Sequence, residues 1–262
     1  MTAGAPLTSN RTRTRFIVAA GVFFMGNAFA SRADAQRSSY VQADVRQPAR
    51  VSGRVTLLGR VPRPQRLLIT KDTEVCGEGF RIRPTADTAN GRGLRNVVIV
   101  IEGVTEGKPW PTRNQPPVLD QADCFFQPHL QLVRRSDTLT IVNSDPVLHN
   151  VHTYELFDAG RRTLFNYGQP PEREVIHGPI RPRRGNIVRI ECDAHDFMLG
   201  WIYVIDNPYA AVVDATGAFS IDGIPPGTYT IRAWSPYLGT VSRELTFAPN
   251  SASELIFEFP GD

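Results

Sequence analysis

The stretch of sequence that most clearly suggests chemistry is ECDAHDFMLGW, residues 191–201. It contains Cys192, His195 and Met198 at intervals of three residues. A thiolate, an imidazole and a thioether converge if the loop curls once, and sulfur ligands of this kind favour copper. Met198 is the only methionine after Met25. The alternative is that Met198 fills the hydrophobic core.

A type 1 copper site needs two histidines and one cysteine in a trigonal set, with a weak axial methionine. The segment TIVNSDPVLHNVHTY supplies the missing histidine, His149, just past an expected strand. The motif L-H-N followed by C-x-x-H-x-x-M resembles the cupredoxins, the blue-copper electron carriers, and its tight spacing is most similar to the amicyanin group. This resemblance implies that His149, Cys192, His195 and Met198 bind one copper ion. It also implies that Asn150 ties the two ligand loops together.

Two further histidines leave alternatives open. His152 lies three residues after His149, so on a strand the two side chains point to opposite faces and do not share one copper ion. His129 and His152 could form a second metal site or a point of copper uptake. The alternative, which we favour, is that they are surface residues or hydrogen-bonded core residues.

The chain has three cysteines, Cys76, Cys124 and Cys192. In an oxidising compartment two of them can pair, which leaves one over. The simplest allocation is a Cys76–Cys124 disulfide and a metal-bound Cys192. Such a disulfide would stabilise the fold by roughly 4 kcal/mol in the entropic description. The alternatives are that Cys192 is a buried thiol, or that one of the other two joins a metal site.

The N-terminus, residues 1–36, has the pattern of a signal peptide and lead-in. Three arginines between residues 11 and 15 precede the apolar run FIVAAGVFFMGNAFA, which is too short to span a bilayer. Two small-x-small cleavage sites follow, at 28–30 and 33–35. We therefore expect a Sec-type signal, a periplasmic or secreted protein, and no transmembrane segment in the mature chain. The alternative is an uncleaved anchor helix.

Charge argues against nucleic-acid binding. The chain has 29 Lys and Arg against 26 Asp and Glu. Three of the arginines lie in residues 1–30, which contain no acid. The remainder is therefore balanced, and long-range steering of nucleic acid has little support.

Strands and turns dominate the rest of the sequence, which contains 21 Gly and 21 Pro. Alternating or β-branched runs predict strands in the ranges 49–59, 96–104, 129–143 (two strands), 185–192, 200–206 and, after residue 207, five more. No helical period exceeds two turns. Residues 153–184 are expected to be a long, irregular, arginine-rich insertion, either a solvated loop or a basic rim that steers an acidic partner.

The sequence after residue 207 contains the pattern D-A-T-G-x-F-x-I-x-x-I-P-P-G-x-Y-x-I. This pattern resembles the carboxypeptidase regulatory-like domain, which has a small transthyretin-like β-sandwich. The expected fold class is thus all-β: a cupredoxin-like Greek-key β-sandwich at 45–207, followed by a smaller transthyretin-like sandwich at 208–262. The second sandwich could borrow a strand from 49–60.

The expected function is that of an exported mononuclear type 1 copper protein, not an enzyme, because no nucleophile–base pair or carboxylate dyad is visible. It would carry single electrons to or from a redox partner, a cytochrome or a dehydrogenase or oxidase. One alternative is non-redox copper binding or delivery, in which His129 and His152 would matter. Another is an extracytoplasmic adhesion or carbohydrate-binding module.

Overall fold

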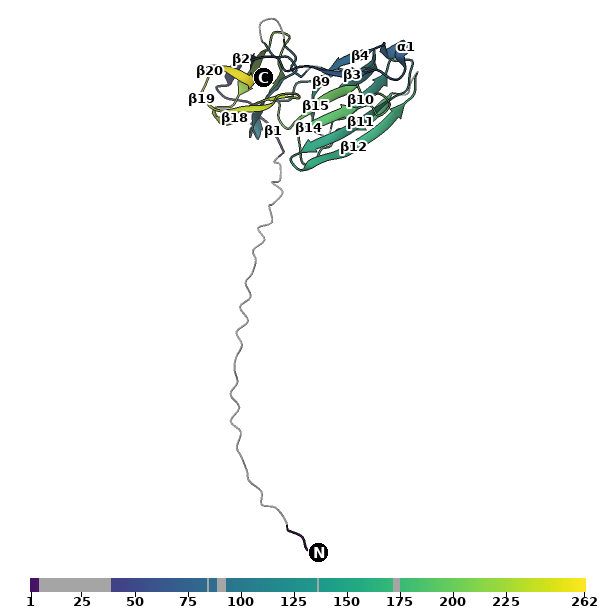
Figure 1. Ribbon diagram of the computed structural model, residues 1–262. Helices are drawn as coiled ribbons and strands as arrows, with labels where there is room; N and C mark the ends of the chain where they lie inside the picture. Colours follow the sequence, from purple (N-terminus) through teal and green to yellow (C-terminus); the bar gives the residue numbers. More distant parts are fainter. Residues whose placement is uncertain (5–38, 84, 89–92, 136, 172–174) are drawn as a thin grey trace. The chain divides into compact units, whose positions relative to one another are not determined.

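Strands carry almost all of the regular structure in the computed structural model. It describes residues 1–4, 39–83, 85–88, 93–135, 137–171 and 175–262 (Figure 1). The expected signal peptide therefore lies almost wholly outside the described residues. The single helix of the described part is the one-turn α1 (Thr73–Cys76). Within these ranges, no helix has the length and apolar character to cross a bilayer.

The loop with Cys192 and His195 belongs to a sandwich of two sheets that pack face to face. The five-stranded sheet has the order β12 (Gly160–Gln169), β11 (His149–Phe157), β14 (Ile187–Glu191), β15 (Leu199–Ile205), β9 (Leu130–Arg134). The four-stranded sheet has the order β13 (Ile176–Pro179), β10 (Thr138–Asn143), β7 (Val118–Ala122), β8 (Phe125–Gln127). Alternate residues of these strands face inward, as the period of two requires. Their core includes Leu119, Phe126, Ile141, Val151, Ile190 and Ile202.

Two more sheets form a second sandwich. One has the order β16 (Ala210–Val212), β5 (Val98–Glu102), β18 (Gly227–Ser235), β19 (Gly239–Phe247). The other has the order β17 (Ala218–Ile224), β2 (Ala49–Leu58), β20 (Ala252–Pro260). Their shared core includes Val51, Leu57, Ile99, Ile231, Phe257 and Phe259.

The second sandwich draws on two segments from early in the chain. Strand β2 lies between β17 and β20, and Figure 1 shows it beside β20 although the two are far apart in sequence. Strand β5 pairs with β16 and β18, although its residues fall inside the range 45–207 expected for the first sandwich. The two domain ranges stay a prediction, and these pairings show that a simple division of the sequence at residue 207 does not separate the two sets of sheets.

A third apolar cluster joins strands of the two sandwiches. Trp201 and Tyr203 on β15 contact Trp234 on β18, with ring centroids 5.8 and 5.4 Å apart. All three side chains are buried. Strand β5 has apolar residues on both faces because one face fills this cluster and the other fills the core of the second sandwich.

Short pairings complete the fold. Strand β1 (Val41–Gln42) pairs with β6 (Glu106–Gly107), and β3 (Gln65–Leu68) pairs with β4 (Phe80–Arg83). Helix α1 lies between β3 and β4. The disulfide between Cys76 and Cys124, expected from the cysteine count, is present and fastens the end of this helix to the β7–β8 turn.

The expectation of an irregular insertion at 153–184 is wrong. Strand β11 continues to Phe157, and a turn leads into the ten-residue β12. Strand β12 lies at the edge of its sheet, with one neighbouring strand, and its first four residues are exposed. Its outer residues are therefore free to be polar, and the apolar alternation that marks a strand in sequence is weak there.

Candidate metal centre

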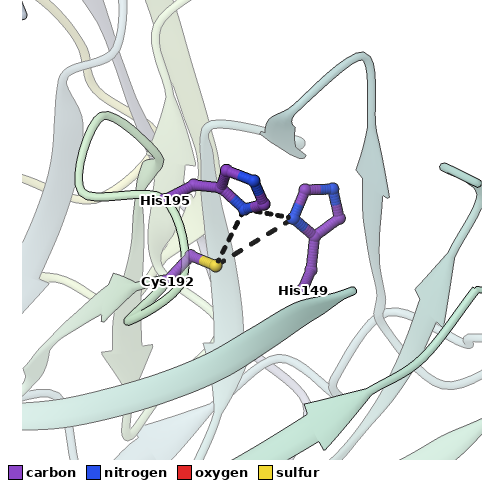
Figure 2. A group of neighbouring side chains, drawn as sticks. All are labelled: His149, Cys192 and His195. Atoms are coloured by element: carbon purple, nitrogen blue, oxygen red, sulfur yellow. Dashed lines mark hydrogen bonds between the residues drawn. The ribbon is translucent and has the colours of Figure 1, made fainter. Parts of the chain in front are cut away.

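Three side chains from two segments converge at one end of the first sandwich (Figure 2). His149 begins β11, Cys192 directly follows β14, and His195 lies in the loop between β14 and β15. The Nδ1 atoms of the two histidines are 3.0 Å apart, and Sγ of Cys192 lies 3.7 Å from Nδ1 of His195 and 4.0 Å from Nδ1 of His149. The antiparallel pairing of β11 with β14 brings the two segments together.

The size of this triangle matches a metal ion. The point equidistant from corners with these separations lies about 2.1 Å from each atom, which is the length of a metal–nitrogen bond and close to that of a metal–sulfur bond. Two imidazoles and a thiolate in a trigonal set are the equatorial ligands that type 1 copper uses. The donor set therefore fits copper in both chemistry and dimensions.

Each of the two histidine rings contacts a carboxylate through its Nε2 atom. Nε2 of His149 lies 2.8 Å from Oδ2 of Asp145, and Nε2 of His195 lies 2.8 Å from Oδ2 of Asp72. An ionised carboxylate only accepts hydrogen bonds, so each Nε2 donates to its carboxylate and each Nδ1 faces the triangle. The two Nδ1 atoms, 3.0 Å apart, thus face each other across the position that a metal ion would take.

Asn150 joins the two ligand segments. Its backbone N–H donates to Sγ of Cys192 over 3.4 Å. Its side-chain Oδ1 accepts the backbone N–H groups of Asp193, at 2.6 Å, and Ala194, at 3.3 Å. These contacts match the role that the sequence resemblance implies for Asn150, and they fix the sulfur relative to β11.

Met198 is buried in the same core cluster as Cys192. Its backbone N–H donates to the carbonyl oxygen of His195 over 3.0 Å, which closes the loop after the histidine. This turn brings Met198 back into the core below the loop. Its assignment as an axial ligand stays a prediction.

Burial shapes the protonation of the ligands. The side chains of His149, His195 and Cys192 are 0%, 1% and 2% exposed. Burial lowers the pKa of His149, although Asp145 opposes the shift, so the ring stays neutral. Burial raises the pKa of the Cys192 thiol, so a bound metal must displace its proton.

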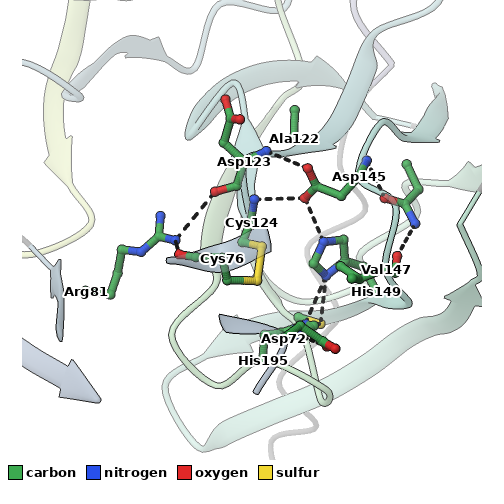
Figure 3. Close-up of a disulfide and its surroundings, with 12 residues drawn as sticks. Asp72, Cys76, Arg81, Ala122, Asp123, Cys124, Asp145, Val147, His149 and His195 are labelled. Atoms are coloured by element: carbon green, nitrogen blue, oxygen red, sulfur yellow. Dashed lines mark hydrogen bonds and ion pairs between the residues drawn. A yellow bond between two sulfur atoms is a disulfide. The ribbon is translucent and has the colours of Figure 1, made fainter. Parts of the chain in front are cut away.

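Asp145 also stabilises the turn that carries the disulfide. Cys124, Asp145 and His149 form a second close group, but the sulfur of Cys124 is bonded to Cys76 and is not available to a metal. Asp123 and Cys124 both have positive φ angles, in the left-handed region that non-glycine residues rarely adopt. Asp145 accepts the backbone N–H groups of both residues at 2.8 Å (Figure 3).

His129 and His152 do not form a common site. Strands β14 and β15 separate β11, which carries His152, from β9, which His129 directly precedes. Nε2 of His129 contacts the hydroxyl of Tyr237 at 2.6 Å, whereas Nδ1 of His152 contacts Asp193 at 3.0 Å. Neither belongs to a group of three potential metal ligands in the described part of the chain.

Asp72 and Asp145 are the residues of the site that sequence reasoning missed. Asp72 lies 123 residues before His195, and nothing in the local sequence marks it. Asp145 lies four residues before His149, in the turn NSDPVLH. An acid at that spacing, just before a candidate ligand, is the signal that could have been used.

Comparison with known proteins gives a limited likeness. No protein-family description and no curated protein matches the chain. Among solved structures, the reduced Cu(I) form of an amicyanin variant is 21% identical over 41% of this chain and 98% of its own, with a TM-score of 0.30. The oxidised state of another amicyanin variant is 22% identical over the same shares, with a TM-score of 0.29. A purple cupredoxin from Nitrosopumilus maritimus is 18% identical over 34% of this chain and 99% of its own, with a TM-score of 0.27. At these TM-scores the functional assignment depends on the site itself.

Proposed function

We propose that the chain is a mononuclear type 1 copper protein that carries single electrons between other proteins. The observation that carries this proposal is the triangle of His149 Nδ1, His195 Nδ1 and Cys192 Sγ, whose dimensions suit an ion at bonding distance from all three. Met198 would be the weak axial ligand, and copper would supply a one-electron couple.

The residues around the site suit electron transfer better than catalysis. The three donors are buried, so a substrate molecule from solvent does not reach them in this arrangement. Electron transfer does not require direct contact between the metal and the partner. Asp72, Asp145 and Asn150 hold the donors in fixed positions. Rigid donors change little when the charge of the ion changes, which keeps the reorganisation on oxidation and reduction small.

The partners belong to this proposal. A donor protein would be oxidised by one electron and an acceptor reduced by one, and a cytochrome or a dehydrogenase or oxidase would fit either role. An exported location, periplasmic or secreted, would explain how a disulfide persists beside a thiolate site. We propose a scaffold or interaction role for the second sandwich, as its regulatory-like sequence pattern implies.

The test is a visible absorption spectrum of the full chain with Cu(II), beside Cys192→Ser and Cys76→Ser/Cys124→Ser. We expect an intense blue colour from charge transfer between thiolate and copper in the wild type. Cys192→Ser should abolish the colour. The double variant retains Cys192 and should retain the colour, although with weaker binding.

Three other outcomes would contradict the proposal. A colourless protein that binds copper tightly would indicate storage or delivery. A protein that prefers zinc over copper in competition would indicate a structural zinc site. A chain that binds neither metal would leave the adhesion or carbohydrate-binding function, which glycan binding by Cys192→Ser would then support.

A further inference from the structure

Both metal-facing histidines are backed by an aspartate. Asp72 and Asp145 come from different parts of the fold: Asp72 directly precedes α1, and Asp145 follows β10. Each accepts a hydrogen bond from Nε2 of its histidine at 2.8 Å, on the side of the ring opposite the triangle of donors. Such outer carboxylates fix the orientation of a ligating imidazole and raise its basicity.

The local structure of Asp72 is directed toward His195. An aspartate before a helix usually accepts a backbone N–H of the first turn. Asp72 makes no such side-chain bond to α1. Its φ of 49° lies in the left-handed region, which is unfavourable for most residues and tolerated by Asp, Asn and Gly. In this conformation the carboxylate of Asp72 contacts His195 and does not cap the helix.

The disulfide connects the supports of the two aspartates (Figure 3). On one side, the backbone N–H of Cys76 donates to the carbonyl oxygen of Asp72 over 2.8 Å. On the other, the backbone N–H of Cys124 donates to Oδ2 of Asp145 over 2.8 Å. The Cys76–Cys124 bond closes a continuous chain of contacts that runs from His195 through Asp72 to Asp145 and His149.

A second bridge accompanies the disulfide. Arg81 donates to the carbonyl oxygens of Cys76, at 3.0 Å, and Asp123, at 3.5 Å, and its guanidinium lies over the rings of Phe125 and Phe197. This bridge does not depend on the cysteines, so loss of the disulfide should loosen the support without removing it.

We propose that Asp72 and Asp145 are positioning residues of the metal centre, and that the Cys76–Cys124 disulfide acts on the metal by holding the two aspartates in place. This rests on the proposed function for the identity of the metal. Neither cysteine of the disulfide binds the ion. Asp72 is thus the residue through which the segment 65–83, with β3, α1 and β4, supports the site.

The first test compares Asp72→Gly, Asp72→Asn and Glu74→Gln in the full chain. Glycine removes the carboxylate without strain at a positive φ, and asparagine retains a carbonyl acceptor in the same conformation. We expect Asp72→Gly to weaken Cu(I) binding roughly 10- to 100-fold in a chelator competition, and Asp72→Asn to recover part of the loss. Glu74→Gln removes a charge from the same helix at an exposed position and should leave binding essentially unchanged.

The second test is a double-mutant cycle between Asp72→Gly and Cys76→Ser/Cys124→Ser. If the disulfide acts through Asp72, its removal weakens copper binding in the wild type but has a smaller effect once Asp72 is gone. Equal effects in both backgrounds would overturn this link. Unchanged affinity in Asp72→Gly would overturn the role of Asp72.

A measurement without metal separates this inference from the proposed function. Nitrogen-15 NMR of the metal-free chain should show His149 and His195 protonated at Nε2, with a slowly exchanging proton on each. In Asp72→Gly, the Nε2 proton of His195 should exchange with water much faster or move to Nδ1, whereas that of His149 should stay protected. A wild-type chain that binds no copper but shows this pattern would refute the proposed function and retain the carboxylate–histidine arrangement, whereas an Nδ1-protonated His195 would refute the arrangement.

Discussion

The residues of the candidate metal centre are of two kinds: those that offer a ligand atom to a metal, and those that hold these ligands in place. The neutral, buried His149 and the buried thiol of Cys192 are poor at carrying charge alone, because burial lowers the pKa of the imidazole and raises the pKa of the thiol. A metal ion changes that balance, since it stabilises the thiolate that burial penalises. Metal binding and the order of the loop that contains Cys192 should therefore be coupled.

Asn150 provides a test at this scale. Asn150→Ala leaves the backbone N–H groups of Asp193 and Ala194 without their acceptor, and we expect a loss of about 1–3 kcal/mol in the free energy of unfolding. Asn166→Ala removes the acceptor of the Asn150 side-chain N–H but retains Oδ1 of Asn150, so it serves as the matched control. Urea denaturation of the metal-free proteins measures both, and equal losses in the two variants would contradict this role of the side-chain oxygen.

At the scale of elements, Glu155 on β11 organises the edge of the five-stranded sheet. Its carboxylate is buried and accepts a hydrogen bond from the guanidinium of Arg162 at 2.6 Å. It also accepts the backbone N–H groups of Gly185, at 2.8 Å, and Arg184. Burial raises the pKa of Glu155, but these hydrogen bonds outweigh it and lower the pKa to about 2. The ionised form thus links β11, β12 and the turn before β14.

This lowered pKa predicts a pH dependence of stability. Because the folded pKa is below the ordinary value of 4.5, the contribution of Glu155 is fully present above pH 4.5 and is lost as the pH falls toward 2. Glu155→Gln should lower the free energy of unfolding at neutral pH by about 1–3 kcal/mol. The difference from wild type should shrink between pH 4.5 and 2.

Urea denaturation across this pH range measures the effect. The control is Glu254→Gln on β20, where the side chain is exposed. Surface substitutions away from such buried networks change stability little, so this variant should match the wild type at every pH. A difference between Glu155→Gln and wild type that stays constant with pH would contradict the prediction.

The elements also show what sequence can predict. Strands β5, β9, β10, β14 and β15 fall where their apolar patterns place them, since burial on one or two faces leaves a direct mark on the sequence. Cys192 and His195 lie in the loop after the predicted strand β14, and His149 begins β11. The three side chains that the sequence singles out lie close together in the structure.

Partners across the sheets leave no such mark. The pairing of β5 with β18 depends on long-range contacts that local sequence does not encode, and β12 is hidden by its exposed edge position. The contact of Asp72 with His195 joins residues 123 apart, and a single aspartate in a loop has no distinctive spacing. Predicting it would require the position of the whole 65–83 segment.

At the scale of the whole molecule, the aromatic cluster couples the two sandwiches. Trp234 packs against Trp201 and Tyr203, and β15, which carries both, follows the loop that contains His195. Trp234→Ala should cost about 3–5 kcal/mol through lost burial and a cavity. It should also separate thermal unfolding into two transitions, because fewer contacts then join the sandwiches.

Calorimetry of the full chain measures this prediction. The matched control is Ile256→Ala on β20, which lies outside the cluster and is 56% exposed. Because truncating an exposed side chain leaves no cavity, this variant should unfold much as the wild type does. A single, unshifted transition in Trp234→Ala would contradict the coupling.

The position of β2 has a consequence for the order in which the chain can fold. Its residues, 49–58, pair with residues 252–260 in parallel register. During synthesis, β2 emerges roughly 200 residues before its partner, and such distant contacts form slowly. The strands that position His149, Cys192 and His195 all lie before residue 206 and can pair earlier. The sheet that contains β11, β14 and β15 can therefore form first. The edge of β2 that pairs with β20 stays unpaired until residues 252–260 are also present.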